Sequence, residues 1–339
     1  MNDYGRALYA TEITARDVYP KNMDEEEIAA KSGFLGKTQL PWWIRPGIKY
    51  RGLWFQMNPN SGGEFEKYYD MQNDVNLALH LDKKQRFVIV GTASYANNIT
   101  VFDKKNYWYP REYYLRFKYS NNFWVYLGQL DKVFGIRLID HTAVSRQPIR
   151  LGQFSQSQGA VLHWTYPKWD IAVNPFMGNS NEKDEVRQKG GSISGEFEVH
   201  ENFKVGASAL SSESTQEKWS LVAASTRMGL SKGSAIMAEV GLKEFTNKVT
   251  NADAILGSYA WVETLINIRR GYNLLSVIEH SRSDLSKSSS ESMKWSIGGL
   301  LFPLPKTEVR LTVANGKFST PSGGVPDMWQ LQSQIHFAF

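Results

Sequence analysis

Short runs in which hydrophobic and polar residues alternate make up most of the chain from residue 47 onward. In one run the odd positions are Ile193, Gly195, Phe197 and Val199, and the positions between them are Ser192, Ser194, Glu196 and Glu198. Successive side chains of a β-strand point to opposite faces of a sheet. A period of two therefore predicts a strand with one apolar face and one polar face.

These runs predict about sixteen strands, although counts of about 14–18 are compatible with the pattern. Two runs, 122–130 and 218–229, do not divide clearly into an apolar and a polar face. The strands are expected over residues 48–57, 67–81, 85–95, 111–119, 122–130, 158–166, 168–177, 191–200, 203–211, 218–229, 233–245, 255–267, 271–282, 292–302, 307–316 and 328–339.

The connections between the expected strands alternate between short and long. Residues 82–84, 120–122 and 201–202 are short polar turns, whereas residues 97–110 and 131–157 are long. Short turns at one rim and longer loops at the other are typical of outer-membrane barrels, whereas nothing imposes this alternation on a soluble sandwich. The predicted fold class is therefore all-β: a transmembrane antiparallel up-and-down β-barrel over residues 47–339, preceded by a short N-terminal extension that contains a helix.

Composition agrees with a barrel whose two faces meet different solvents. Hydrophobic residues make up 42% of the chain, and the mean hydropathy is −0.41. No stretch approaches the roughly 18 apolar residues that a membrane-spanning helix needs. Aromatic residues nevertheless reach 13%. A barrel explains both facts, because alternate residues face lipid and water and aromatic residues gather at the two membrane interfaces.

Charge and cysteine content exclude several classes of site. The chain has no cysteine, so disulfides, thiolate metal sites and cysteine nucleophiles are excluded. Its formal net charge is only +5, with acidic and basic residues mixed, so nucleic acid is not an expected partner. The first residues contain no apolar segment of the signal-peptide kind. If the barrel prediction is right, we expect a leader to have been removed.

Residues 1–46 depart from the alternating pattern. Residues 22–33 carry acidic side chains at the start of an expected short helix, where the helix dipole favours negative charge. Trp42 and Trp43 follow between two prolines. This segment is expected to be a periplasmic arm with a short helix, with a plug or gate inside the lumen as the alternative; an extra strand over residues 7–14 also remains open.

Aromatic residues lie near both ends of the expected strands. We expect Tyr119, Tyr166 and Trp169 at the interface near the short turns, and Trp219 and Trp329 at the interface near the long loops. Tyr and Trp place an apolar ring and a polar tip at the level of the lipid headgroups. These positions predict two aromatic belts.

At the level of pattern, residues 47–339 resemble a Gram-negative outer-membrane porin. The resemblance rests on the even number of strands and on a last strand that ends in Phe339 with Phe337 two residues earlier. It implies a mature outer-membrane protein in contact with lipid and lipopolysaccharide, with Phe337 and Phe339 read by the barrel-assembly machinery. Homotrimers are common in this family, and residues 1–46 offer a contact for an envelope partner. The extension departs from the usual porin, whose first strand begins almost at once.

The long connection over residues 131–155 corresponds in order and length to the loop that narrows general porins. It carries Arg137, Asp140, His141, Arg146 and Arg150, together with apolar residues that need cover, such as Phe134 and Ile136. We expect it to fold inward as a constriction. A cap over the mouth and a contact between subunits are the alternatives.

Charged residues on the polar faces at mid-height are Arg51, Asp74 and Glu239. Rings of charge in a narrow aqueous pore set its preference for ions. The sequence alone does not separate a role in lining the pore from pairing across the lumen.

An enzyme is a less favoured class. Asp140-His141 and Glu279-His280 are adjacent pairs, but neighbours in a strand point to opposite faces and do not cooperate directly. No phosphate-binding glycine loop or zinc motif is present, and residues 179–185 only faintly resemble a calcium loop. We therefore expect no catalytic residue, cofactor or metal. The expected function is passive passage of ions or small polar solutes, with a structural or partner-binding barrel closed by its N-terminal segment as the principal alternative.

Overall fold

A computed structural model describes residues 41–59, 63–96, 107–136, 143–145, 149–152, 155–231, 233–250, 253–269, 271–304, 307–317 and 327–338. The expected N-terminal helix and the possible strand over residues 7–14 lie outside these ranges. The described residues include one complete 3-10 helix, η4 (Ser288–Ser290), and no helix among them is long and apolar enough to cross a membrane.

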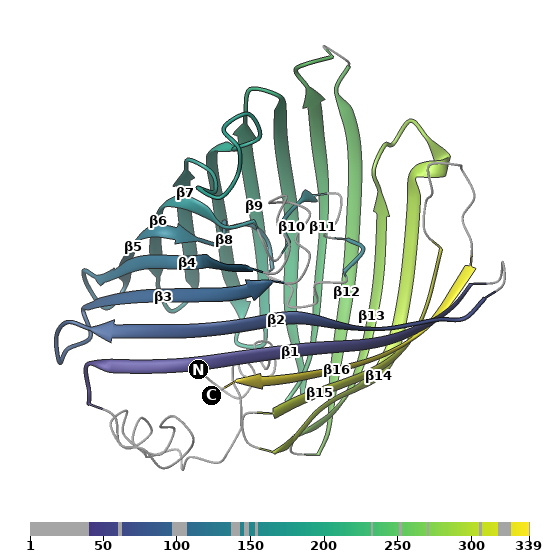
Figure 1. Cartoon of the computed structure of the whole chain (residues 1–339), viewed down its shortest axis with the longest axis horizontal. Coiled ribbons are helices and arrows are strands. Elements are labelled where there is room, and N and C mark those ends of the chain that lie inside the picture. Colours follow the sequence, from purple (N-terminus) through teal and green to yellow (C-terminus); the bar gives the residue numbers. More distant parts are fainter. Residues whose placement is uncertain are drawn as a thin grey trace.

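The strands form one closed antiparallel barrel of sixteen, which confirms the predicted all-β up-and-down barrel and its strand number. Each strand pairs with its neighbours in the sequence, and β1 pairs with β16 from Lys49↔Ala338 to Pro59↔Met328. Figure 1 shows the sequence colours progressing around the wall until β16 lies beside β1. The strands are β1 (Ile44–Pro59), β2 (Phe65–His80), β3 (Phe87–Ala96), β4 (Tyr107–Lys118), β5 (Phe123–Leu130), β6 (Ser157–Thr165), β7 (Trp169–Phe176), β8 (Lys189–His200), β9 (Phe203–Glu213), β10 (Glu217–Ser231), β11 (Ser234–Asn247), β12 (Ile255–Arg269), β13 (Tyr272–Arg282), β14 (Glu291–Leu304), β15 (Thr307–Lys317) and β16 (Asp327–Ala338).

The strand boundaries agree with the alternating runs to within a few residues. The largest differences are at β1 and β4, which begin at Ile44 and Tyr107 rather than at residues 48 and 111. The barrel therefore begins inside the segment that was expected to form the arm. The end of the barrel that carries the short connections is called the short-turn rim below. The opposite end, which carries the longer connections, is called the long-loop rim.

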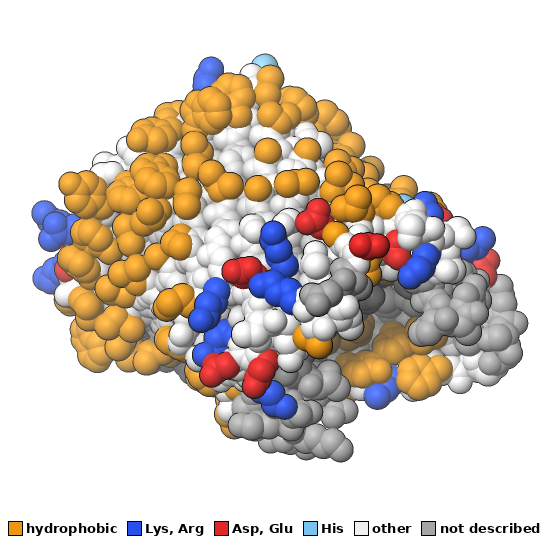
Figure 2. Space-filling model, turned by 90° about the horizontal axis from the view of Figure 1, so that it is seen from above, with side chains coloured by type: hydrophobic (Ala, Val, Ile, Leu, Met, Phe, Trp, Pro, Cys, Tyr) orange, Lys and Arg blue, Asp and Glu red, His pale blue; other side chains and the backbone are white. Residues whose placement is uncertain are grey.

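The outward face is apolar over much of its area. Figure 2 shows hydrophobic side chains spread over a broad part of one face. Ile193, Val222, Val240 and Leu242 are among the exposed residues, and each stands at a position that alternates with a buried or lumen-facing one. An exposed apolar surface of this extent is abnormal for a soluble monomer and indicates a surface that another apolar phase covers.

The inward face differs between the two sides of the barrel. On β1, β2, β15 and β16 it carries polar and charged side chains such as Arg51, Asp74, Arg310 and Gln334. On β9–β12 it carries apolar side chains such as Leu221 and Trp261. The apolar inner side explains why the run 218–229 does not divide into faces: inward Trp219 and Leu221 are as apolar as outward Val222, and both faces also carry polar residues.

Candidate constriction inside the barrel

The connection between β5 and β6, called loop L3 here (residues 131–156), packs inside the barrel. Its buried residues Phe134, Ile136 and Ile149 form one cluster with inward-facing residues of five strands. Those wall residues are Phe176 of β7, Leu210 of β9, Leu221 of β10, Met237 of β11, and Tyr259 and Trp261 of β12. The described part of the loop therefore covers the apolar half of the inner wall, as its own apolar residues led us to expect.

A carboxylate of β11 holds the first part of the loop. Glu239, which is only 1% exposed, accepts a hydrogen bond from the Ile136 backbone N–H at 2.5 Å and another from the Tyr259 hydroxyl at 2.8 Å. The neighbouring Gly135 N–H donates to Ser208 Oγ at 3.0 Å. Buried carboxylates remain stable where donors satisfy their oxygens, so this cluster fixes the loop backbone to the wall.

Gly135 is required by this contact. Its φ of +59° lies in the left-handed region, and a Cβ built at this position would lie 2.3 Å from Glu239 Oε2. Any side chain would combine an unfavourable backbone conformation with a clash against the carboxylate. The close approach of loop and wall therefore depends on glycine.

A second carboxylate holds the far part of the loop. Glu279 of β13 accepts hydrogen bonds from the Ser145 N–H at 3.2 Å and the Ser145 hydroxyl at 2.9 Å, and Lys294 Nζ lies 3.6 Å from its other oxygen. His280, its neighbour, instead pairs with Glu291 at 3.0 Å. The two residues have separate partners, as strand geometry predicts, and do not form a joint acid–base site.

The polar side of the lumen carries a buried ion pair between β2 and β4. Arg111 Nη1 lies 2.8 Å from Asp74 Oδ2, and Ser94 and Gln72 donate to the same carboxylate at 2.5 Å each. Arg111 stands at a bulge in β4, where the pairing with β3 shifts between Thr92 and Ala93. The bulge directs this arginine to the lumen, and simple alternation along the sequence does not reveal it.

A further charged group lies where β1, β15 and β16 meet. His336 Nδ1 is 3.4 Å from Arg51 Nη2 and 3.9 Å from Glu308 Oε2. All three residues are 3% exposed. Arg51 therefore faces the lumen as expected, but its side chain is covered.

The structure accounts for the predicted site residues unevenly. Arg51, Asp74 and Glu239 face inward, and Glu239 lies beneath L3, where it holds the loop. Arg150 lies in L3, where its guanidinium contacts Glu217 at 2.6 Å and stacks 4.6 Å from the centre of the Trp219 ring. Arg137, Asp140 and Arg146 lie outside the described residues.

Most of the predicted interface aromatics are exposed on the outer wall. Tyr119, Tyr166, Trp169 and Trp329 are between 47% and 72% exposed. The prediction for Trp219 is wrong: this ring is 7% exposed, on the inner side of β10 beneath Arg150. The alternating pattern locates Trp219 along its strand but does not show which face it occupies. Because L3 covers the inner wall, a large aromatic residue can face inward there.

Aromatic ring contacts connect neighbouring strands near the short-turn rim: two pairs are stacked, and the pair Trp169 and Phe197 is tilted. Ring centres are 4.6 Å apart for Phe87 and Phe117, 4.8 Å for Phe123 and Trp164, and 4.3 Å for Trp169 and Phe197. At the seam of the barrel, Phe337 stacks on Tyr50 at 6.3 Å. Phe339 lies outside the described residues.

Several residues that organise this site were not anticipated in these roles. Glu279, Lys294, Tyr259 and Arg111 all connect parts of the chain that are distant in sequence. Glu279, Lys294 and Tyr259 share one signal, a polar residue on the inward face of a strand, which the alternating pattern does contain; Arg111 lacks this signal because it stands at the bulge. Among the described residues, no cluster of three or more His, Asp or Glu side chains is arranged to hold a metal ion.

Comparisons with known proteins reveal a shared fold at low sequence identity. No family model and no curated protein matches the chain. Solved structures match with TM-scores of 0.64 for the outer-membrane OmpT of Vibrio cholerae, 0.64 for the outer-membrane channel DcaP of Acinetobacter baumannii and 0.65 for an anion-selective porin from Comamonas acidovorans. The identities are 8%, 12% and 8%; each match covers 87% of this chain and 97%, 97% and 99% of the other. The chain thus has the fold of the outer-membrane porins, as a porin-type barrel whose subfamily is not identified.

Proposed function

We propose that this protein is an outer-membrane channel through which ions or small polar solutes diffuse passively. Loop L3 narrows the lumen, and solutes pass between the loop and the polar wall that carries Asp74 and Arg111. The single observation that carries the proposal is the attachment of L3 inside the barrel through Glu239 and Glu279. A loop held in this way restricts the lumen through contacts within the chain itself.

The direct test is single-channel recording in planar bilayers with Glu239→Ala. A hydrogen bond to a charged acceptor contributes about 1.5–3 kcal/mol. Without the Glu239 carboxylate the loop should be held less firmly, so we expect larger conductance and greater current noise. Glu244→Ala is the matched control, because this glutamate lies on the same strand but is exposed. Unchanged conductance in Glu239→Ala would show that L3 does not form the constriction.

A barrel closed by its N-terminal segment is the second candidate. It is favoured by the burial of Arg51, Glu308 and His336, since these residues face a lumen that would expose them to water if it were open. Because β1 begins at Ile44, residues 1–40 can be removed without shortening a strand. Conductance only after this truncation would identify a plug, whereas silence of both forms would eliminate the channel.

We further propose residence in the outer membrane, where the exposed apolar wall contacts lipid and lipopolysaccharide. The aromatic side chains Tyr119, Tyr166 and Trp169 would lie at one interface and Trp329 at the other. Assembly through the C-terminal strand, and a homotrimer or an envelope partner bound by residues 1–46, belong to the same proposal. Hydrolysis of envelope lipid or peptide that is lost in a His141→Ala, His280→Ala double variant would argue for an enzyme instead.

A further inference from the structure

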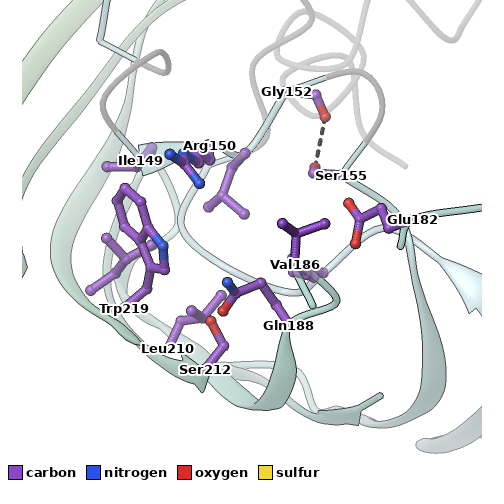
Figure 3. Close-up of a pocket in the computed structure, with 13 residues that line it drawn as sticks. Ile149, Arg150, Gly152, Ser155, Glu182, Val186, Gln188, Leu210, Ser212 and Trp219 are labelled. Atoms are coloured by element: carbon purple, nitrogen blue, oxygen red, sulfur yellow. Dashed lines mark hydrogen bonds between the residues drawn. The ribbon is translucent and has the colours of Figure 1, made fainter. Parts of the chain in front are cut away.

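A cavity of about 470 Å³ lies beside L3, between this loop, the connection from β7 to β8 and the inner wall of β9 and β10. Figure 3 shows its labelled residues converging on one space from these three parts of the chain. Its volume is within the range of about 300–1,000 Å³ that small-molecule sites usually have. The connection from β7 to β8 comprises residues 177–188.

The wall of the cavity is mainly apolar. Leu210, Leu221 and Trp219 supply the barrel side, and Ile149 and Val186 supply the loop side. The Trp219 ring is held in place by the Arg150 guanidinium, which stacks on it at 4.6 Å. Since Arg150 also pairs with Glu217 at 2.6 Å, the indole has a fixed orientation and suits a flat apolar group.

The charged groups at the cavity are Lys132, Arg150 and Glu182. Lys132 Nζ lies 5.1 Å from the centre of the Phe176 ring, and Arg150 and Trp219 lie on the side of the cavity opposite Glu182. Burial lowers the pKa of the Lys132 ammonium, and burial raises the pKa of the Glu182 carboxyl. Burial dominates at Lys132 although the carboxylates of Glu182 and Asp131 act on its pKa in the opposite direction. A further anion beside Lys132 would therefore favour its charged form.

We propose that this cavity binds aromatic monocarboxylates, with the ring against Trp219, Leu210 and Leu221 and the carboxylate at Lys132 and Arg150. Two cationic side chains favour one anionic group. Glu182, across the cavity from Arg150, disfavours a second anionic group, so dicarboxylates should bind more weakly than monocarboxylates. The proposal extends the proposed channel by naming a solute class, but binding itself does not require the lumen to conduct.

The experiment is calorimetric titration of the full chain in detergent with benzoate, benzyl alcohol, benzylamine and phthalate. A charge-assisted hydrogen bond is worth about 1.5–3 kcal/mol, so benzoate should bind at least about tenfold more tightly than benzyl alcohol. Phthalate and benzylamine should bind more weakly than benzoate. Equal affinities for benzoate and benzyl alcohol would overturn the proposal.

Three variants separate the roles of the lining residues. Lys132→Met should weaken benzoate binding about tenfold by the same reasoning, whereas Lys287→Met, at an exposed lysine of another loop, should leave it unchanged. Trp219→Leu should remove the advantage of benzoate over acetate. Glu182→Gln should strengthen the binding of phthalate. Benzoate affinity that is the same in Lys132→Met and in the unmodified protein would contradict the site.

The dependence of benzoate affinity on pH is a measurement that a lysine with only a structural role would not affect. Because burial lowers the pKa of Lys132 and a bound carboxylate raises it again, benzoate binding should take up protons above the lowered pKa. Affinity should therefore increase as the pH falls through that range, and Lys132→Met should abolish the dependence. Benzoate binding without any conductance in bilayers would refute the proposed channel but support the binding site. Conductance without benzoate binding would support the channel and refute the binding site.

Discussion

At the scale of single residues, buried carboxylates play two different roles on the inner wall. Glu239 and Glu279 accept hydrogen bonds from backbone groups of L3, so their charge is used to hold the loop. Asp74 pairs with Arg111 on the polar side of the inner wall. The inward positions of Asp74 and Glu239 follow from alternation along the strands. Their partners do not, because those partners depend on a bulge in β4 and on a loop folded inside the barrel.

The Asp74–Arg111 pair should influence both stability and ion preference. Breaking a buried pair by removing one charge costs about 3–5 kcal/mol, and Asp74→Asn leaves Arg111 unbalanced. We expect a lower free energy of unfolding and a shift of the reversal potential toward anion preference in a KCl gradient. Asp184→Asn, at a carboxylate whose side chain is 84% exposed, should change neither property. A reversal potential that is unaffected by Asp74→Asn would show that the conduction path lies elsewhere.

At the scale of the strands, the period of two was sufficient to locate all sixteen. It succeeded because one face of most strands is apolar and the other is polar. It failed to assign the faces of β10, since Trp219, Leu221 and Ala223 point inward and pack near L3. The sequence of a strand shows which face points inward only where its two faces meet different environments. On β10 the folded loop L3 covers the inward face, so both faces contact apolar surroundings.

The two faces should respond differently to an added charge. Val240 lies in the middle of β11 and is 56% exposed on the apolar outer wall. Val240→Lys should lower the free energy of unfolding in lipid vesicles by about 2–4 kcal/mol, because lysine at the bilayer midplane faces hydrocarbon. Gln332→Lys places the same side chain on the polar inner face of β16 and should cost much less. Equal losses would argue that the outer wall is not embedded in lipid.

At the scale of the whole molecule, closure of the barrel depends on the pairing of the first strand with the last. β1 and β16 pair along most of their length, so no strand edge is left open there. Phe337 stacks on Tyr50 across this seam. The C-terminal strand thus has two roles in our proposal: it closes the barrel, and it presents Phe337 and Phe339 to the assembly machinery.

These two roles can be separated by comparing assembly in cells with refolding in detergent. Phe337→Ala, or deletion of Phe339, should reduce the amount of folded barrel in the outer membrane several-fold, while the purified variant still refolds and shows heat-modifiable migration on gels. Phe123→Ala is the control, because it also removes a stacked aromatic residue of the short-turn rim, but from an internal strand. If all three variants lose membrane-inserted protein equally, aromatic packing explains the effect and the C-terminal strand carries no separate signal. A loss confined to the terminal variants, with refolding intact, would instead show that these residues act during delivery to the membrane, because the closed barrel itself forms without them.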